Sequence, residues 1–229
     1  MKVNKVVFPV AGLGSRFLPA TKSIPKEMLP IIDKPLIQYA VDEAIDAGFS
    51  ELIFITGNTK KAIQDHFKFN PDLNISNLTE DKKNFLSEMH RVIPSHVSCK
   101  YIIQDEPLGL GHAILQAKEA IGEDPFAVVL ADDLIDSKQG VLKQMLDHYN
   151  DENSSIISVQ KIMKSESINY GIIEFKEVNK DLMKIINIVE KPSPENAPSN
   201  YGVVGRYILS SKIFSMLDKV SAGVGNEIQ

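Results

Sequence analysis

The chain has 229 residues, of which 43% are hydrophobic, so it can bury the core of one large domain, with or without a smaller lobe. Its formal net charge of -5 argues against nucleic acid and membranes as partners, so any phosphate must be bound by local cations. The single cysteine, Cys99, excludes a disulfide framework or structural zinc site, and no run reaches the roughly 18 apolar residues of a membrane span. We expect a cytoplasmic globular protein, with Cys99 as a buried, inert thiol.

The first two thirds of the chain alternate between strand-like and helix-like segments. Apolar, β-branched runs predict strands, and the amphipathic runs between them predict helices. This alternation is typical of βαβ units, whose parallel sheet is covered by helices and binds ligands beyond the carboxyl ends of its strands. The predicted strands are 5–10, 51–57, 98–104 and 126–132; the predicted helices are 35–48, 59–67 and 109–122; and 70–96 is assigned to helix and loop without chemistry.

From Ser154 onward the predicted strands follow one another closely. We expect them to form a second, smaller lobe with a mixed sheet. The chain is therefore read as one domain, with a first part over 1–153 and a second part over 154–229. The predicted elements of the second part are strands 154–162, 170–178, 182–190 and 201–209, followed by a helix at 211–220.

A glycine turn and several cations follow the first strand, in "AGLGSRFLPATKSIPKEMLP". Gly-x-Gly is only the weak part of a dinucleotide fingerprint, because Phe17 stands where a third glycine would be, and no Gly-Lys-Ser/Thr completes a P-loop. The remaining interpretation is a turn whose backbone N–H groups face an anion, with Arg16 and Lys26 available to further phosphate oxygens. The alternative is a tight turn beside two solvated cations.

The whole run resembles the signature of the bacterial sugar nucleotidyltransferases, G-x-G-[ST]-R-x-x-P-x-T followed by P-K-x-M-L-P. The motifs "GLGHAI", "LADDL", "EKP" and "APSNYGVVGRYIL" resemble the members that use UTP, and the resemblance runs from Val6 to Gln229. It implies a Rossmann-like three-layer α/β/α nucleotidyltransferase fold with a mostly parallel central sheet and a smaller sugar-binding lobe. It also implies uridylyl transfer from UTP to glucose 1-phosphate, giving UDP-glucose and pyrophosphate.

Such a transfer needs no side-chain nucleophile, because the sugar phosphate itself attacks the α-phosphorus. We find no Ser-His-Asp or Cys-His set, and the barrier must fall through positioning, cations and a divalent metal. Glycine N–H groups, Arg16, Lys26 and a carboxylate-bound Mg²⁺ fit that need. The resemblance implies that Lys191 contacts the phosphate of the sugar substrate.

Asp132 and Asp133 end the apolar strand-like run of "FAVVLADDL". Mg²⁺ keeps several waters and uses one or two protein carboxylates plus substrate phosphate oxygens. The resemblance assigns the metal to Asp132 and places Asp133 near the ribose. The alternative is an Asp-Asp pair that only caps the following turn.

Base recognition is expected in "QDEPLGLGHAI". The Gln104 amide donates and accepts, which matches the imide edge of uracil, but thymine shows the same edge, so Gln104 does not separate UTP from dTTP. A plain helix-entry turn at Gly109 and Gly111 is an equal alternative, and His112 is expected to pack there rather than to catalyse. The resemblance implies nucleotide contacts for Gln104, Gly109, the backbone of Ala11 and Gly12, the Gly14 turn, and Glu27.

The second lobe contributes "NYGIIEF" and "VEKP". A carboxylate such as Glu190 accepts two hydrogen bonds from neighbouring sugar hydroxyls, and Lys191 beside it can reach a phosphate. The resemblance assigns these jobs, and adds Gly171 and the backbone near Val204 to the sugar pocket. On its own, this pair would be read as a surface ion pair.

Relatives of this kind continue past "EIQ" with a Leu-Thr-Asp-Ala segment, a helix, and a strand bearing a second metal-binding Asp, which this sequence does not contain. The resemblance also implies a homo-oligomer for the longer form. Two alternatives stay open: a thymidylyltransferase or other sugar nucleotidyltransferase with the same site plan, and a nucleotide-sugar binding subunit without turnover.

Overall fold

The computed structural model describes residues 3–68, 79, 81, 92–106, 108–149, 154–179 and 181–220. Most of the segment 70–96, assigned to helix and loop from the sequence, lies outside these residues, as does the chain after 220. Within the described ranges, no helix is long and apolar enough to cross a bilayer.

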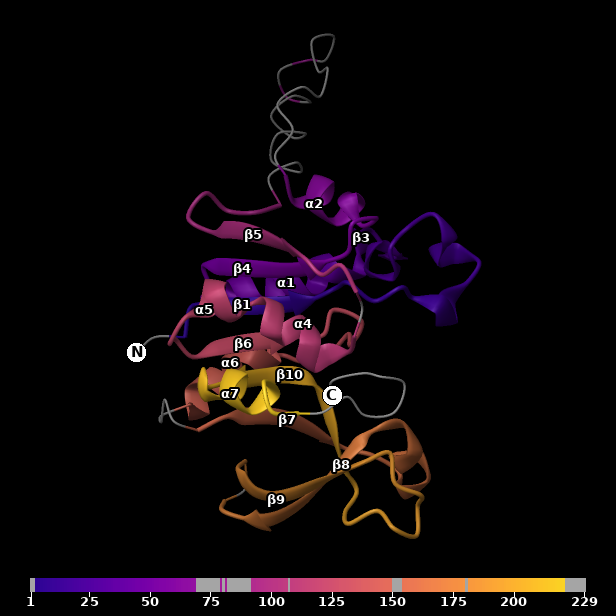
Figure 1. The fold of residues 1–229 in the computed structure, drawn as a ribbon, viewed down its shortest axis with the longest axis vertical. Coiled ribbons are helices and arrows are strands. Elements are labelled where there is room, and N and C mark those ends of the chain that lie inside the picture. The colour runs from indigo at the N-terminus through magenta and orange to yellow at the C-terminus, as the bar shows by residue number, and fades with distance from the viewer. Residues whose placement is uncertain are drawn as a thin grey trace.

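One eight-stranded sheet organises the molecule, in the order β5-β4-β1-β6-β10-β8-β9 with β7 paired to β10 (Figure 1). β1 runs parallel to β4 and β6, and β4 runs parallel to β5, whereas β10 is antiparallel to its three partners. Every predicted strand is present. They are β1 Lys5–Pro9, β4 Glu51–Thr56, β5 Ser98–Ile103, β6 Phe126–Val129, β7 Ile156–Lys161, β8 Gly171–Glu177, β9 Met183–Glu190 and β10 Tyr201–Leu209.

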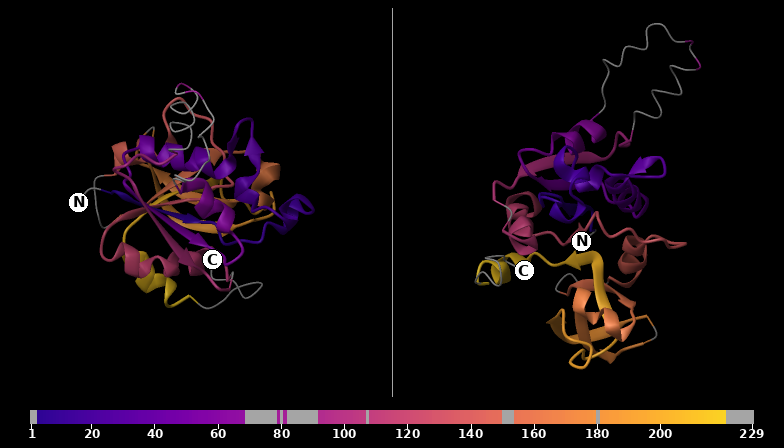
Figure 2. Two further views of the ribbon diagram at one scale, coloured as in Figure 1. Left: turned by 90° about the horizontal axis from the view of Figure 1, so that it is seen from above. Right: turned by 90° about the vertical axis from the view of Figure 1, so that its right-hand side faces the viewer.

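Helices cover both faces of this sheet (Figure 2). Successive side chains of a strand point to opposite faces, so Val6 and Phe8 pack with α1, α2 and α6, while Val7 packs with α4, α5 and α7. A strand that is apolar on both faces therefore requires two helical layers, and the predicted three-layer fold with a mostly parallel centre is confirmed. The helices are α1 Leu36–Asp46, α2 Lys61–Phe67, α4 Leu110–Gln116, α5 Lys118–Ile121, α6 Val141–His148 and α7 Lys212–Leu217.

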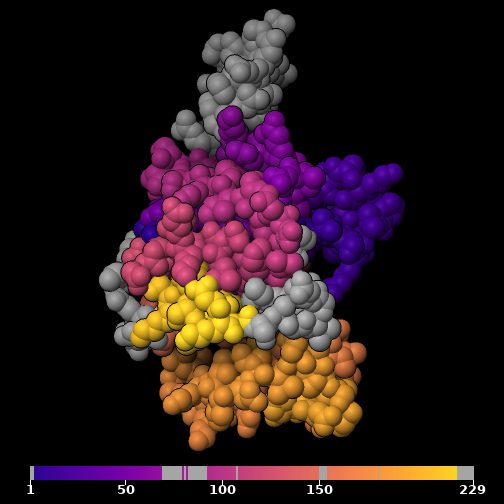
Figure 3. All heavy atoms as spheres, viewed as in Figure 1, coloured from indigo at the N-terminus to yellow at the C-terminus, as the bar shows by residue number. Residues whose placement is uncertain are grey.

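Short, irregular elements fill the proline-rich stretch between β1 and α1. This indigo segment projects at one side of the body (Figures 1 and 3). It consists of the 3-10 turns η1 Ser15–Phe17, η2 Ala20–Lys22 and η3 Lys26–Met28, and of the hairpin β2 Pro30–Ile31 and β3 Lys34–Pro35.

The smaller lobe extends the same sheet. β10 joins the two parts: its last residues pair with β6, its first pair with β8, and its register with β7 shifts between Val203 and Tyr207. The described strand pairs within the lobe, including β8 with β9, are antiparallel. The sequence predicted a mixed sheet for the lobe, but parallel and antiparallel pairs are mixed only when the whole sheet is considered. The turn η4 Lys164–Asn169 lies between β7 and β8.

Cys99 on β5 is half-buried rather than fully buried. Burial raises the pKa of its thiol to about 11, because the thiolate would be charged in a poorly solvated place. The thiol is therefore protonated near neutral pH, as an inert side chain requires.

Candidate functional site

A cavity of about 460 Å³ opens beyond the carboxyl ends of the parallel strands. Strands β1, β5 and β6 each run straight into a segment that lines it, and these ends meet because the strands are parallel. The structure thus brings together seven of the residues singled out from the sequence. They are Ala11, Gly12, Lys26, Glu27, Gln104, Gly109 and Asp132.

The two glycines of the first turn play different structural parts. A Cβ at Gly12 would meet no atom within 4 Å, so this backbone borders open cavity. Gly14 has φ +66°, and a Cβ there would lie 3.1 Å from Cβ of Lys26. Thr21 Oγ1 donates to the Gly14 carbonyl at 2.7 Å. Gly14 therefore packs against the aliphatic part of the Lys26 side chain, whereas Gly12 borders the cavity.

Lys26 and Asp132 form an ion pair at the cavity wall. Nζ of Lys26 lies 2.6 Å from Oδ2 of Asp132, and the side chains are 22% and 44% exposed. A cation and a carboxylate that arrive from residues far apart in sequence thus hold each other beside the glycine turn. Both can exchange partners when an anion and a metal ion enter together.

Asp133, predicted to lie near the ribose, is engaged with the backbone. Its Oδ2 accepts a hydrogen bond from the amide of Gly205 on β10 at 2.7 Å. A Cβ at Gly205 would come within 2.7 Å of Leu130 Cβ and 2.8 Å of that oxygen. Asp133 thus ties the Asp132 loop to β10, and its partner Gly205 was missed from the sequence.

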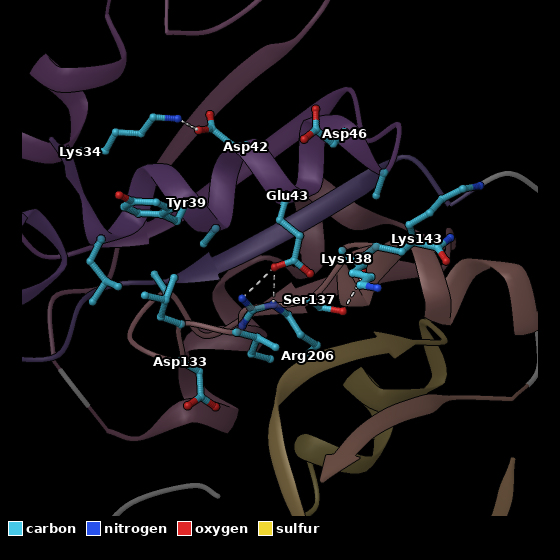
Figure 4. Close-up of a pocket in the computed structure, with 18 residues that line it drawn as sticks. Lys34, Tyr39, Asp42, Glu43, Asp46, Asp133, Ser137, Lys138, Lys143 and Arg206 are labelled. Carbon is cyan, nitrogen blue, oxygen red and sulfur yellow. Dashed lines mark hydrogen bonds and ion pairs between the residues drawn. The ribbon is translucent and has the colours of Figure 1, made fainter. Parts of the chain in front are cut away.

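The loop that carries Asp132 is also held by a buried ion pair between Arg206 and Glu43. This pair lines a second cavity of about 560 Å³ (Figure 4). Arg206 is 2% exposed and donates from Nε and Nη2 to Oε2 of Glu43, at 3.0 and 2.8 Å. Its Nη1 donates to the Leu130 carbonyl at 3.2 Å, and Glu43 Oε1 accepts from the Leu142 amide. Neither member of this pair was identified from the sequence.

Glu27, predicted to contact the nucleoside, lines the cavity but is 1% exposed and paired. Both of its carboxylate oxygens accept from Nζ of Lys60, at 3.0 and 2.9 Å. Lys60 is itself 6% exposed, and burial lowers the pKa of its ammonium. It was missed because no motif marks it, although it follows the carboxyl end of β4, where a site residue is expected.

Gln104 is 4% exposed and belongs to a short polar chain. Its Nε2 lies 2.6 Å from Nδ1 of His112, and Nε2 of His112 lies 3.0 Å from the amide nitrogen of Gln116. Gly109, with φ +95°, begins α4 next to them. The helix-entry turn and the cavity wall are therefore the same segment.

The remaining predicted residues do not line this cavity. Arg16 is exposed on η1 and does not line it. In the lobe, Gly171 faces Glu190 across β8 and β9, and Lys191 Nζ lies 3.3 Å from Glu190 Oε1. Val204 is buried and lines a separate groove between α6 and the lobe strands.

Among the described residues no group of three metal-binding side chains occurs. Two carboxylates line the cavity: Glu27, which is buried against Lys60, and Asp132, whose side chain is 44% exposed. One carboxylate suits an ion that takes its other ligands from phosphate and water.

A mostly parallel sheet, with glycine backbone, a lysine and a carboxylate gathered at its carboxyl edge, is typical of α/β proteins that bind phosphates. The chain belongs to the nucleotidyl transferase family, whose model matches residues 5–226. The resemblance inferred from the sequence is confirmed.

Two similar proteins are named for the same reaction. The chain is 46% identical to UTP–glucose-1-phosphate uridylyltransferase YngB of Bacillus subtilis (strain 168), over 100% of this chain and 76% of that protein. It is also 46% identical to the UTP–glucose-1-phosphate uridylyltransferase of Pseudomonas aeruginosa, over 99% of this chain and 82% of that protein.

Two solved structures have the same fold as this chain. One is a UDP-glucose pyrophosphorylase complexed with UDP-glucose, with TM-score 0.88 and 43% identity, over 100% of this chain and 84% of that chain. The other is a UTP-bound UGPase from Acinetobacter baumannii, with TM-score 0.89 and 40% identity, over 100% and 80%.

Proposed function

We propose that this protein transfers the uridylyl group of UTP to glucose 1-phosphate, giving UDP-glucose and pyrophosphate. A phosphate oxygen of the sugar attacks the α-phosphorus, the bond to the β-phosphate oxygen breaks, and pyrophosphate leaves with the electron pair. The observation that carries the proposal is the meeting of Gly12, Lys26 and Asp132 in one cavity. Its specific form is supported by the uridylyltransferases that match the whole chain.

Each residue acts by placing charge. The Gly12 backbone borders the phosphate path, and the Lys26 ammonium moves from Asp132 to a phosphate oxygen, where it offsets negative charge in the transition state. Arg16, exposed beside the turn, offers a fork of donors to the same phosphates. Asp132 would hold Mg²⁺, which when bound would neutralise further negative charge on the phosphates. No protein nucleophile is needed, because the sugar phosphate attacks directly.

The proposal divides the chain as the sequence predicted: 1–153 binds the nucleotide and 154–229 binds the sugar, through Gly171, Glu190, Lys191 and the backbone near Val204. A homo-oligomer and a cytoplasmic location belong to the same proposal. The single cysteine accords with a reducing compartment, and light scattering of the purified protein measures the subunit number.

The test is a product assay with UTP, glucose 1-phosphate and Mg²⁺, in which UDP-glucose and pyrophosphate are measured together. We expect equal amounts of both. Pyrophosphate release without sugar phosphate contradicts direct attack, and faster turnover with dTTP than with UTP indicates a thymidylyltransferase. UDP-glucose binding without turnover indicates a binding subunit.

Gly12→Ala is expected to weaken UTP binding about tenfold or more while the melting temperature stays within a few degrees. The added methyl group meets no protein atom, so the fold accepts it, but it occupies space needed for phosphate approach. Gly14→Ala is the contrast, because φ +66° and the contact with Lys26 make it destabilising. Unchanged UTP calorimetry for Gly12→Ala would place the phosphates elsewhere.

Lys191→Gly is expected to stabilise the fold by about 0.5–1 kcal/mol and to lower turnover about 10- to 100-fold. Lys191 has φ +44°, which costs a residue with a side chain more than glycine, and strain of this kind gathers at functional sites. Its ion pair with Glu190 is more than half exposed and contributes little. Lys191→Met removes the charge and keeps the strain, so it should lose turnover without gaining stability; full activity in both variants would assign Lys191 to the surface.

A further inference from the structure

The polar chain from Gln104 through His112 to Gln116 has no part in the chemistry described above. His112 lies between two amides, one on each ring nitrogen, at 2.6 and 3.0 Å. Only the first amide, that of Gln104, lines the cavity. The ring can therefore carry a constraint from outside the cavity to a side chain that meets the ligand.

The hydrogen-bonding rules of a neutral imidazole fix the direction of both amides. One ring nitrogen carries the proton and donates, while the other accepts. The Gln104 nitrogen can only donate, so Nδ1 of His112 is the acceptor and the ring proton sits on Nε2. The structure places the Gln116 amide nitrogen 3.0 Å from that same Nε2, but a neutral ring that accepts at Nδ1 cannot also accept at Nε2. The half-buried Gln116 must therefore turn its amide and present the oxygen to the ring proton, so the tautomer of His112 follows from the shorter contact with the buried Gln104.

This arrangement leaves a defined edge of Gln104 for the base. Nε2 of Gln104 carries two hydrogens and gives one to His112, so the amide oxygen and the second hydrogen remain available to a ligand in the cavity that Gln104 lines. Uracil matches such an edge with its N3–H donor and a carbonyl acceptor. Cytosine, held in the same place, presents a donor and an acceptor in swapped positions, and would be matched only if the amide turned over.

We propose that His112 is a positioning residue that selects uracil over cytosine, by holding the Gln104 amide in one of its two orientations. The inference rests on the proposed function, because it assumes that the base lies against Gln104. Thymine shares the imide edge of uracil, so His112 does not discriminate between UTP and dTTP.

The test changes the tautomer without touching the cavity wall. Gln116→Lys places a donor-only group on Nε2 of His112, which forces the ring proton to Nδ1 and turns the Gln104 amide over. Gln116→Met has similar length with neither a strong donor nor a strong acceptor, and serves as the matched control. His112→Ala removes the constraint altogether. Affinities for UTP, dTTP and CTP are measured by calorimetry, which needs no turnover, and melting temperatures are recorded for each variant.

We expect Gln116→Lys to lower the ratio of UTP to CTP affinity about 10- to 100-fold, the range of one bidentate base contact, with the UTP to dTTP ratio unchanged. His112→Ala should lower the same ratio by a smaller factor, and Gln116→Met should lower it least. Equal loss of affinity for all three nucleotides, or an unchanged UTP to CTP ratio in both Gln116→Lys and His112→Ala, overturns the inference. Failure of the unchanged protein to bind any of them would instead count against the proposed function.

Discussion

Replacing Lys60 with methionine is expected to lower the free energy of unfolding by about 3–5 kcal/mol, the largest stability loss we foresee for a single side chain. The two carboxylate oxygens of Glu27 accept hydrogen bonds from Lys60, and Glu27 is 1% exposed. Without its partner, Glu27 must stay ionised without compensation or take up a proton. Urea denaturation at neutral pH measures the loss.

Two further variants decide whether burial is the cause. Lys118→Met breaks an ion pair with Asp218 that is shorter, at 2.6 Å, but about half exposed on both sides, so it should cost under about 1 kcal/mol. Adding Glu27→Leu to Lys60→Met removes the stranded carboxylate and should recover most of the stability. Similar losses for Lys60→Met and Lys118→Met would show that burial of the first pair carries no special weight.

Strand positions were predictable from the sequence because β1, β4 and β6 are apolar on both faces. The order of strands then placed several chain segments at one edge, which is why Gly12, Gln104 and Asp132 meet in a single cavity. These predictions need only local hydrophobicity and the geometry of parallel sheets.

The supports behind the cavity could not be predicted in this way. Arg206 reaches Glu43 across 163 positions of sequence, and Gly205 reaches Asp133 across 72. Both contacts depend on the antiparallel register of β10 against β6, in which Arg206 faces Val129. No local pattern specifies that register, so the hydrogen bond between Asp133 and Gly205 could not be predicted, and the ribose contact of Asp133 stays a prediction.

Replacing Asp132 with asparagine is expected to lower turnover at least about 100-fold and to leave the fold intact. The ion pair with Lys26 is partly exposed, so its loss should cost less than about 1 kcal/mol of stability. Whether this variant binds UTP more tightly or more weakly should depend on the presence of Mg²⁺. Without Mg²⁺, UTP should bind about threefold more tightly or better, because a negative charge is gone from beside the phosphates and Lys26 is released.

With Mg²⁺ present the order should reverse, because the residue that would hold the metal has lost its charge. UTP titrations with and without Mg²⁺ measure both signs in one pair of experiments. Asp136→Asn is the matched control: it makes the same change in net charge on an exposed position of the same loop, outside both cavities, and should alter neither titration. If Asp132→Asn kept full turnover, or if Asp136→Asn produced the same reversal, the metal would not belong at Asp132 and the effect would be one of overall charge.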